Sequence, residues 1–334
     1  MAESSRAVAP SFSLASPYGA GLVCAFDLES GASIADEAAE ATDSGHKWLH
    51  FNLSDTRARE WLALRAPIPE HARELLLGSD ARIQLEVQPG SLTAVLGDLY
   101  HDFDNDPERL GTLRLYLTPT LLISGRSHPL KSVDVVRREL RRSQEPHSSL
   151  DVFQLIVERL AASLAQVVTS LGDQVDDAED RILAGKHAGE GTALGNLRRL
   201  VARLRRLVSA NRSALMSLPP ELPGLYGATE RQELRAAREH LDAVWQDLEL
   251  VQERARLLQE EIAARLGEAT NRNLFVLSIA TTTLLPITLI TGIFGMNVGG
   301  LPFAGSAHGF HVVMMGIAIT VLFALWLLRR IGAF

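Results

Sequence analysis

The chain has 334 residues, of which 46% are hydrophobic, so it is long enough for a soluble domain joined to a membrane part. Its formal net charge of −7 excludes a general attraction to nucleic acid, and its single cysteine, Cys24, excludes a disulfide framework or a thiolate metal site within one chain. The N-terminus lacks a charged start followed by an apolar core, so we expect no signal peptide and a cytoplasmic first domain.

Residues 1–149 are predicted to form a cytoplasmic α/β domain. Asp55 is expected to cap a first helix, Pro69 to start a second and Ser132 to start a third, and a linker containing Pro146 closes the domain. The predicted strands, recognised by their β-branched and aliphatic residues, are residues 22–28, 46–53, 82–87, 92–99, 113–117 and 121–124.

Residues 150–272 are predicted to be long cytoplasmic helices that form a stalk. Two of them, at residues 151–184 and 192–218, end at glycines and prolines. A third begins near Thr229 and places apolar side chains at alternating spacings of three and four, which is typical of a coiled-coil seam. If this helix continues to Phe294, it is about 100 Å long and carries any movement of the soluble domain into the membrane.

A charge-free region follows the stalk, because no Asp, Glu, Lys or Arg occurs at residues 273–328. Within it, residues 274–294 and 310–328 each approach the ~20 apolar residues that cross a bilayer as a helix. Two buried core helices are the alternative, but core helices rarely lack charge over so long a stretch. We therefore predict two transmembrane helices.

The positions of the arginines predict the topology of these spans. Arg272 precedes the first span, Arg329 and Arg330 follow the second, and the loop at residues 295–309 has no Lys or Arg. By the positive-inside rule both termini, including the tail at residues 329–334, are cytoplasmic and the loop is outside.

The first span carries a polar stripe, whereas the second span is nearly all aliphatic. One interpretation is a helix that lines a water-filled pore, and the other is hydrogen bonding of the hydroxyls to their own backbone or to a neighbouring helix. Because two helices cannot enclose a pore, the first interpretation requires a ring of several chains. Pro286 is expected to bend the helix. The stripe, which follows a spacing of three or four residues, consists of Asn271, Leu274, Ser278, Thr281, Leu285, Thr288 and Gly292.

Three charged clusters have less specific interpretations. Asp102, Asp104 and Asp106 imitate an EF-hand loop, but a proline and a leucine stand where that loop needs Gly and Glu, so an exposed loop is expected. The acidic run at residues 173–180 and the basic run at residues 198–206 fall on consecutive helices. We expect these runs to attract one another or to face water, and the alternative is that the acidic run concentrates cations near a pore.

The histidine pairs give little support for metal chemistry. His46 and His50 fall on one predicted strand, where such pairs are usually surface or core residues. His308 and His311 flank the outer start of the second span and are the candidate metal ligands there, although no carboxylate is nearby. No nucleotide-binding loop, nucleophile elbow or paired catalytic carboxylate is present, so we do not expect an enzyme.

The triplet Gly295-Met296-Asn297 closes the Thr-rich first span, and the second span follows after a short outer loop. This organisation, behind a long cytoplasmic domain, resembles the CorA metal-ion transporter family. Within that family, Val298-Gly299-Gly300 after the triplet is similar to the ZntB zinc-transporter branch, because the magnesium branch usually carries acidic residues there. Asp106-Pro107-Glu108 is also similar to the ZntB branch.

The resemblance implies a funnel-shaped homopentamer in the bacterial inner membrane, with five copies of the first span around an axial pore. Gly295, Met296 and Asn297 would form the outer selectivity filter, and Arg329 and Arg330 would form a basic collar beside the inner pore end. The implied pore-lining positions are Asn271, Leu274, Leu277, Thr281, Leu285, Thr288 and Thr291.

A neutral lining of amides and hydroxyls has no strong ligands for a bare divalent ion, so the ion is expected to pass with most of its water. Zinc prefers Cys and His ligands, and the implied pore lining has neither, so the prediction of zinc as the transported ion rests on the resemblance to the ZntB branch alone. The predicted function is zinc transport across the membrane, with uptake coupled to protons and no cofactor. The alternatives are zinc efflux, a Mg²⁺ or Co²⁺ channel of the same fold, and a membrane-anchored sensor. A sensor would have no flux to lose when Asn297 is replaced by alanine.

Overall fold

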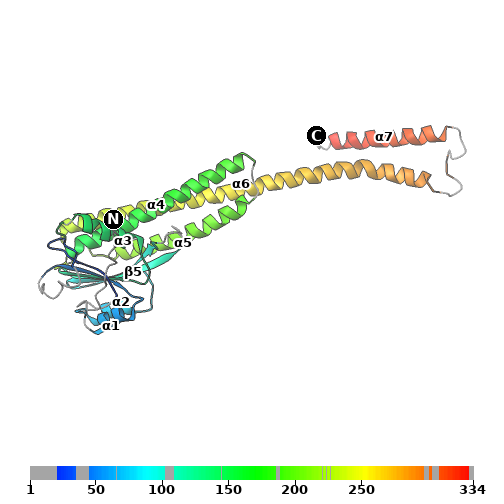
Figure 1. Ribbon diagram of the computed structural model, residues 1–334. Coiled ribbons are helices and arrows are strands. Elements are labelled where there is room, and N and C mark those ends of the chain that lie inside the picture. Colours follow the sequence, from blue (N-terminus) through cyan, green and yellow to red (C-terminus); the bar gives the residue numbers. More distant parts are fainter. Residues whose placement is uncertain are drawn as a thin grey trace, which may run out of the picture. The chain divides into compact units, whose positions relative to one another are not determined.

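The structure, a computed structural model, divides into two compact units, Met1–Leu257 and Leu258–Phe334 (Figure 1). The residues that it describes are 21–34, 45–64, 66–101, 109–143, 145–185, 189–219, 221–222, 224–225, 227–296, 301–302 and 308–330. The EF-hand-like aspartates and Asp106-Pro107-Glu108 lie outside the described residues.

The first unit contains a six-stranded sheet with the strand order β1-β2-β6-β5-β4-β3. Neighbouring strands are antiparallel except β2 and β6, which are parallel. All six predicted strands are confirmed, with ends that differ by up to three residues. The strands are β1 (Leu22–Asp27), β2 (Lys47–Asn52), β3 (Gln84–Gln88), β4 (Ser91–Leu99), β5 (Leu110–Leu117) and β6 (Leu121–Arg126).

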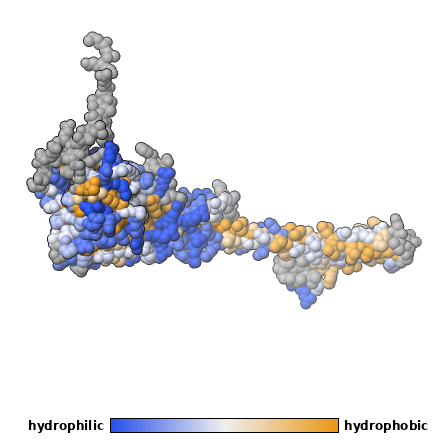
Figure 2. All heavy atoms as spheres, turned by 90° about the horizontal axis from the view of Figure 1, so that it is seen from below, coloured by the Kyte–Doolittle hydropathy of each residue, from blue (hydrophilic) through white to orange (hydrophobic). Residues whose placement is uncertain are grey.

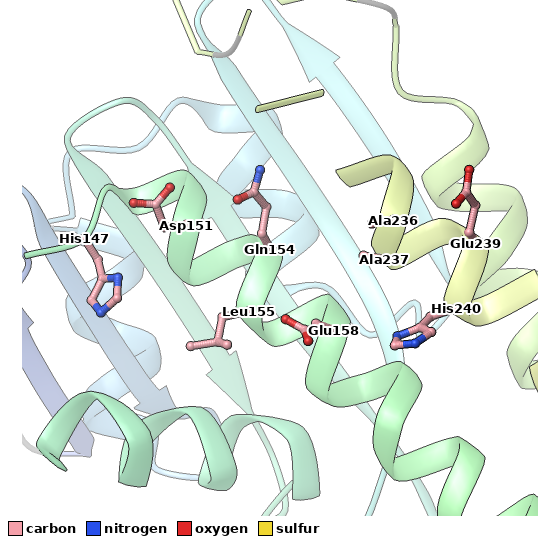
Figure 3. A pocket seen from close by; sticks show the side chains of 9 residues that line it. All are labelled: His147, Asp151, Gln154, Leu155, Glu158, Ala236, Ala237, Glu239 and His240. Carbon is pink, nitrogen blue, oxygen red and sulfur yellow. The ribbon is translucent and has the colours of Figure 1, made fainter. Parts of the chain in front are cut away.

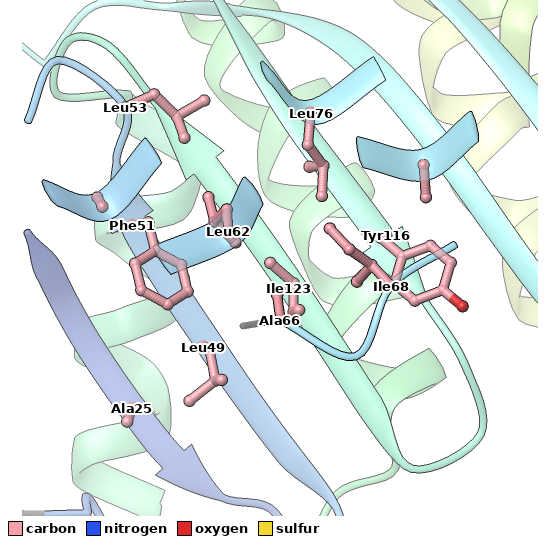
Figure 4. Close-up of a cluster of buried hydrophobic side chains, with 12 residues drawn as sticks. Ala25, Leu49, Phe51, Leu53, Leu62, Ala66, Ile68, Leu76, Tyr116 and Ile123 are labelled. Carbon is pink, nitrogen blue, oxygen red and sulfur yellow. The ribbon is translucent and has the colours of Figure 1, made fainter. Parts of the chain in front are cut away.

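Helices cover both faces of this sheet. On one face, α1 (Thr56–Leu64) and α2 (Glu70–Leu77) close a core that includes Phe51, Leu62 and Ile123 (Figure 4). Residues of a strand alternate between the two faces, so Phe51 points into this core while His50 points to the opposite face. Because both faces are covered, every residue of β4 is buried.

The opposite face is covered by α3 (Lys131–Ser143) and α4 (Ser149–Leu183), and α5 (Glu190–Met216) packs on β3 and β4. A capping box starts α4: the Ser148 hydroxyl accepts the N–H of Asp151 at 3.0 Å, and the Ser148 N–H donates to the Asp151 carboxylate at 2.7 Å. The third long helix, α6 (Ala228–Phe294), is continuous, as predicted.

A chain of buried polar side chains joins β2, β6 and α3. Ser124 Oγ accepts the indole N–H of Trp48 at 2.8 Å and lies 2.7 Å from His50 Nδ1. Arg126 Nε donates to His50 Nε2 at 3.0 Å, so Nε2 carries no proton and Nδ1 does. Burial and the nearby Arg126 and Arg137 guanidinium groups hold the pKa of His50 well below its usual value. His50 is therefore a neutral core residue, while His46 is half-exposed and contacts Glu29 at 2.9 Å.

Asp98 is a second buried polar group, and it anchors the start of α3. Its carboxylate accepts the hydroxyl of Ser132 at 2.6 Å and the N–H of Ser132 at 3.1 Å. Complete burial outweighs these hydrogen bonds and raises the pKa of Asp98 to about 6.

This raised pKa predicts a pH-dependent stability. Between pH ~4 and ~6 the folded chain binds a proton at Asp98 that the unfolded chain has released, so the unfolding free energy falls as pH rises through this window, by about 3 kcal/mol at most. Above it the contribution is constant. Thermal unfolding midpoints of the wild type and of Asp98→Asn, compared from pH 4 to pH 8, test this prediction. A difference between the two midpoints that stays flat over that range would contradict it.

The charged runs on α4 and α5 were expected to attract one another or to face water. Asp173, Asp177 and Asp180 are exposed, as expected. Asp176 and Glu179, however, pair with Arg254 of α6, Glu179 at 3.2 Å. The partner of these two carboxylates is therefore an arginine of α6 and not one of the basic run on α5.

One arginine of the basic run on α5 also has its partner on α6, because Arg205 pairs with Glu249 at 2.9 Å. Arg212, further along α5, pairs with Asp242 of α6. Both guanidinium groups lie 5.4 Å from the centre of the Trp245 ring. The sequence places these charges on the correct helices but does not reveal that α6 supplies partners to both helices.

Candidate pore helix

Three helices are long and apolar enough to cross a membrane within the part of the chain that the structure describes. In α4 the apolar window is 56% buried within the first unit, so its hydrophobicity is explained by the core. The corresponding windows of α6 and of α7 (Gly309–Arg330) are 0% and 11% buried. Figure 2 shows hydrophobic residues over these segments, in contrast with the mostly hydrophilic surface of the first unit.

In the second unit, α7 runs back beside the C-terminal part of α6 (Figure 1). Partly covered residues mark the face of α6 towards α7, and they include Phe275, Ile279, Thr283, Pro286, Ile287 and Ile290. On α7 the matching covered residues include Val313, Gly316, Ile317, Thr320, Val321 and Ala324. Both sets follow helical spacing, as expected for two packed helices.

The predicted polar stripe lies on the other side of α6. At 3.6 residues per turn, its members are centred about 150° around the helix from the residues that face α7. Each of them is exposed in the single chain, and so are Leu277 and Thr291. The stripe is therefore free to face further helices.

The hydroxyls of the two stripe threonines, and that of the neighbouring Thr291, bond to their own helix. Thr281 donates to the Leu277 carbonyl and Thr288 to the Leu284 carbonyl, each at 2.8 Å. Thr291 donates to the Ile287 carbonyl at 2.9 Å. Hydrogen bonding of the hydroxyls to their own backbone was the second interpretation of the stripe, and it does not exclude a pore. A hydroxyl that has given its hydrogen to the backbone still has oxygen lone pairs, so it presents only acceptors to a lumen.

Thr283 differs from these threonines. Its hydroxyl is buried on the side towards α7 and has no hydrogen-bond partner among the described residues. Pro286 lies three residues further along and removes one backbone donor from the helix. Despite Pro286, α6 remains one continuous helix to Phe294.

The first two residues of the triplet close the helix. The Gly295 N–H donates to the Thr291 carbonyl at 2.8 Å, and Met296 is 53% exposed. A Cβ on Gly295 would lie 3.0 Å from the Thr291 carbonyl oxygen, so the close turn favours glycine here. Asn297 and Val298-Gly299-Gly300 lie outside the described residues.

The histidines at the start of α7, His308 and His311, lie in separate local surroundings. The His308 carbonyl accepts the N–H of Val312 at 3.2 Å, and the His311 ring meets the Phe310 ring edge-on at 5.9 Å. Among the described residues, no group of three or more His, Cys, Asp or Glu side chains is placed to hold a metal ion.

A pocket of about 830 Å³ in the first unit had no signal in the sequence, because its walls come from distant parts of the chain. Glu158 of α4 and His240 of α6 face one another across it (Figure 3). Two other carboxylates of the pocket wall have partners outside it: Glu239 pairs with Arg235 at 3.0 Å, and Asp151 caps α4. Its lining residues are His147, Asp151, Gln154, Leu155, Glu158, Ala236, Ala237, Glu239 and His240.

An α/β domain, long helices and two exposed apolar helices of membrane-spanning length, one with a stripe of acceptor oxygens, are features typical of a membrane ion transporter. Residues 43–330 match the model of one family, described as "CorA-like Mg2+ transporter protein". The chain therefore belongs to the CorA family, which is a family of divalent-cation transporters and not of enzymes.

Individual relatives agree with this assignment. The zinc transport protein ZntB of Yersinia pestis is 29% identical over 286 residues, which cover 85% of this chain and 86% of that protein. The divalent cation transporter CmaX of Pseudomonas aeruginosa has the same identity and coverage. The structure of full-length CmaX is similar with a TM-score of 0.80 and 27% identity, over 93% of this chain and 97% of that one. The CorA magnesium transporter of Methanocaldococcus jannaschii shares the fold, with a TM-score of 0.77 at 18% identity.

Proposed function

We propose that this protein transports zinc through a pore lined by α6 in a ring of identical chains. The observation that carries the proposal is the exposed stripe of α6, whose Thr281 and Thr288 hydroxyls are left as acceptors on the side away from α7. The similarity to ZntB and CmaX supports a divalent cation as the transported ion, and the similarity to ZntB supports zinc in particular.

The proposed assembly is a homopentamer in a bacterial inner membrane, with both termini in the cytoplasm. Gly295, Met296 and Asn297 form its outer selectivity filter, and Arg329 and Arg330 lie at the inner end. The proposed pore-lining residues are Asn271, Leu274, Leu277, Thr281, Leu285, Thr288 and Thr291. His308 and His311 sit where several chains together can offer imidazoles to an arriving ion.

This lining favours an ion that keeps its water. The acceptor oxygens of the stripe bind the hydrogens of inner-shell water, which spares the ion the large cost of dehydration. No carboxylate lies in the charge-free region, so proton coupling, which we propose for uptake, must use groups outside the spans. A Mg²⁺ or Co²⁺ channel of the same fold is the second candidate, favoured by the family description.

Metal flux into vesicles that contain the purified full-length chain tests the proposal. We expect Zn²⁺ uptake above that of protein-free vesicles, faster than Mg²⁺ or Co²⁺ uptake, and stimulated by a pH gradient. Mg²⁺ flux that exceeds Zn²⁺ flux and ignores the pH gradient would select the channel instead. A chain that moves no metal in either direction would be a sensor. Flux should also be lost with Asn297→Ala and kept with Asn273→Ala, which lies off the stripe.

A further inference from the structure

The C-terminal end of α7 carries a continuous aromatic and basic surface. The rings of Phe323 and Trp326 stack at 5.8 Å with an interplanar angle of 27°. The Arg330 guanidinium carbon lies 5.4 Å from the centre of the Trp326 ring. Phe323 is 60% exposed and Trp326 is 51% exposed, so this ladder faces outward from α7.

Positive charge is concentrated at this end and is not balanced locally in the sequence. Arg329 and Arg330 are the only charged residues after Arg272, and the last acidic residue of the chain is Glu268. Stacking on Trp326 uses the flat face of the Arg330 guanidinium and leaves its edge N–H groups free to donate. Arg329 is exposed beside it.

We propose that Phe323, Trp326, Arg329 and Arg330 bind an anionic phospholipid. The guanidinium groups donate to the lipid phosphate, as arginine does to planar oxyanions. Trp326 occupies the interfacial level that indole rings prefer, and Phe323, one turn deeper, contacts the acyl chain. A lipid fits better than a free anion because the basic end continues directly into an apolar face. The inference rests on the membrane placement of α7 in the proposed function.

Lipid retention by the full-length chain in a neutral detergent tests this site. The chain is titrated with phosphatidylglycerol or with phosphatidylcholine, and bound lipid per chain is counted by native mass spectrometry. We expect tighter binding of phosphatidylglycerol, and a loss of about fivefold for each arginine removed, so that Arg329→Gln with Arg330→Gln weakens it about 25-fold. Arg141→Gln with Arg142→Gln, two exposed arginines at the end of α3, is the matched control and should leave binding unchanged.

Two further measurements distinguish this lipid site from a purely electrostatic site and from a site for free phosphate. Trp326→Leu should weaken phosphatidylglycerol binding although it removes no charge, because Arg330 loses its stacking partner. Inorganic phosphate at millimolar concentration should not displace the lipid. Equal binding of the two lipids, retention in the double variant, or displacement by phosphate would each overturn the proposal. Because this assay needs no metal flux, a chain that binds phosphatidylglycerol but moves no metal would reject the transport function and keep the lipid site.

Discussion

Replacing Thr281 and Thr288 together with valine is expected to lower divalent-cation flux by at least about tenfold. Valine has nearly the shape of threonine, so the helix and its exposed face are preserved, but two acceptor oxygens are removed. A hydrogen bond contributes ~1 kcal/mol, which is about a fivefold effect for each position, and every chain of a ring carries both changes. Flux into vesicles, normalised to the amount of assembled protein, is the measurement.

The chain offers a matched control on the opposite face. Thr283→Val with Thr320→Val makes the same chemical change on the surface between α6 and α7. The Thr283 hydroxyl is buried without a partner among the described residues, so its removal should leave stability unchanged or slightly improved. If the control loses as much flux as the stripe variant, the effect arises from helix packing. If the stripe variant keeps its flux, these residues do not line the ion path.

The elements of this fold could be predicted from the sequence because local signals agree with the tertiary structure. The strands of the sheet follow from runs of β-branched residues. The long helices follow from capping residues at their starts and from glycine or proline at their ends. Residue spacing alone also grouped the stripe residues on one face of α6, since a helix fixes which side chains share a side. That this face points away from α7 is seen only in the structure. The pore itself remains a prediction, because one chain cannot enclose it.

What the sequence could not provide depends on contacts between distant segments. The acidic residues Asp176 and Glu179 pair with Arg254, more than 70 positions away, and no local pattern identifies that partner. Asp98 and His50 sit in ordinary strand positions, and their altered pKa values follow only from complete burial. The triplet was recognisable by its position at the end of a span, which is a sequence feature and needs no tertiary contact.

A buried amide on α5 completes the edge of β4. Strand β3 pairs with β4 only as far as Val95, so the backbone of Gly97 lies beyond the end of that pairing. The Asn211 side chain takes the place of the missing strand: its carbonyl oxygen accepts the Gly97 N–H and its NH₂ donates to the Gly97 carbonyl, both at 2.8 Å. A Cβ at Gly97 would lie 2.2 Å from Leu207 Cδ1, so this close approach of α5 to the sheet favours glycine.

Asn211→Leu is therefore expected to destabilise the first unit by about 3–5 kcal/mol, because it leaves two buried backbone groups unsatisfied while keeping similar volume. Amides of β4 should then exchange with solvent ~100-fold faster or more, since each 1.4 kcal/mol is a factor of ten. Native-state hydrogen exchange of the full-length chain in detergent measures this. Asn196→Leu, an exposed asparagine on the same helix, should change the exchange little. Equal exchange in both variants would mean that water or a backbone shift satisfies Gly97 once the amide is gone, and that the close fit of Leu207 against Gly97 alone holds α5 to the sheet.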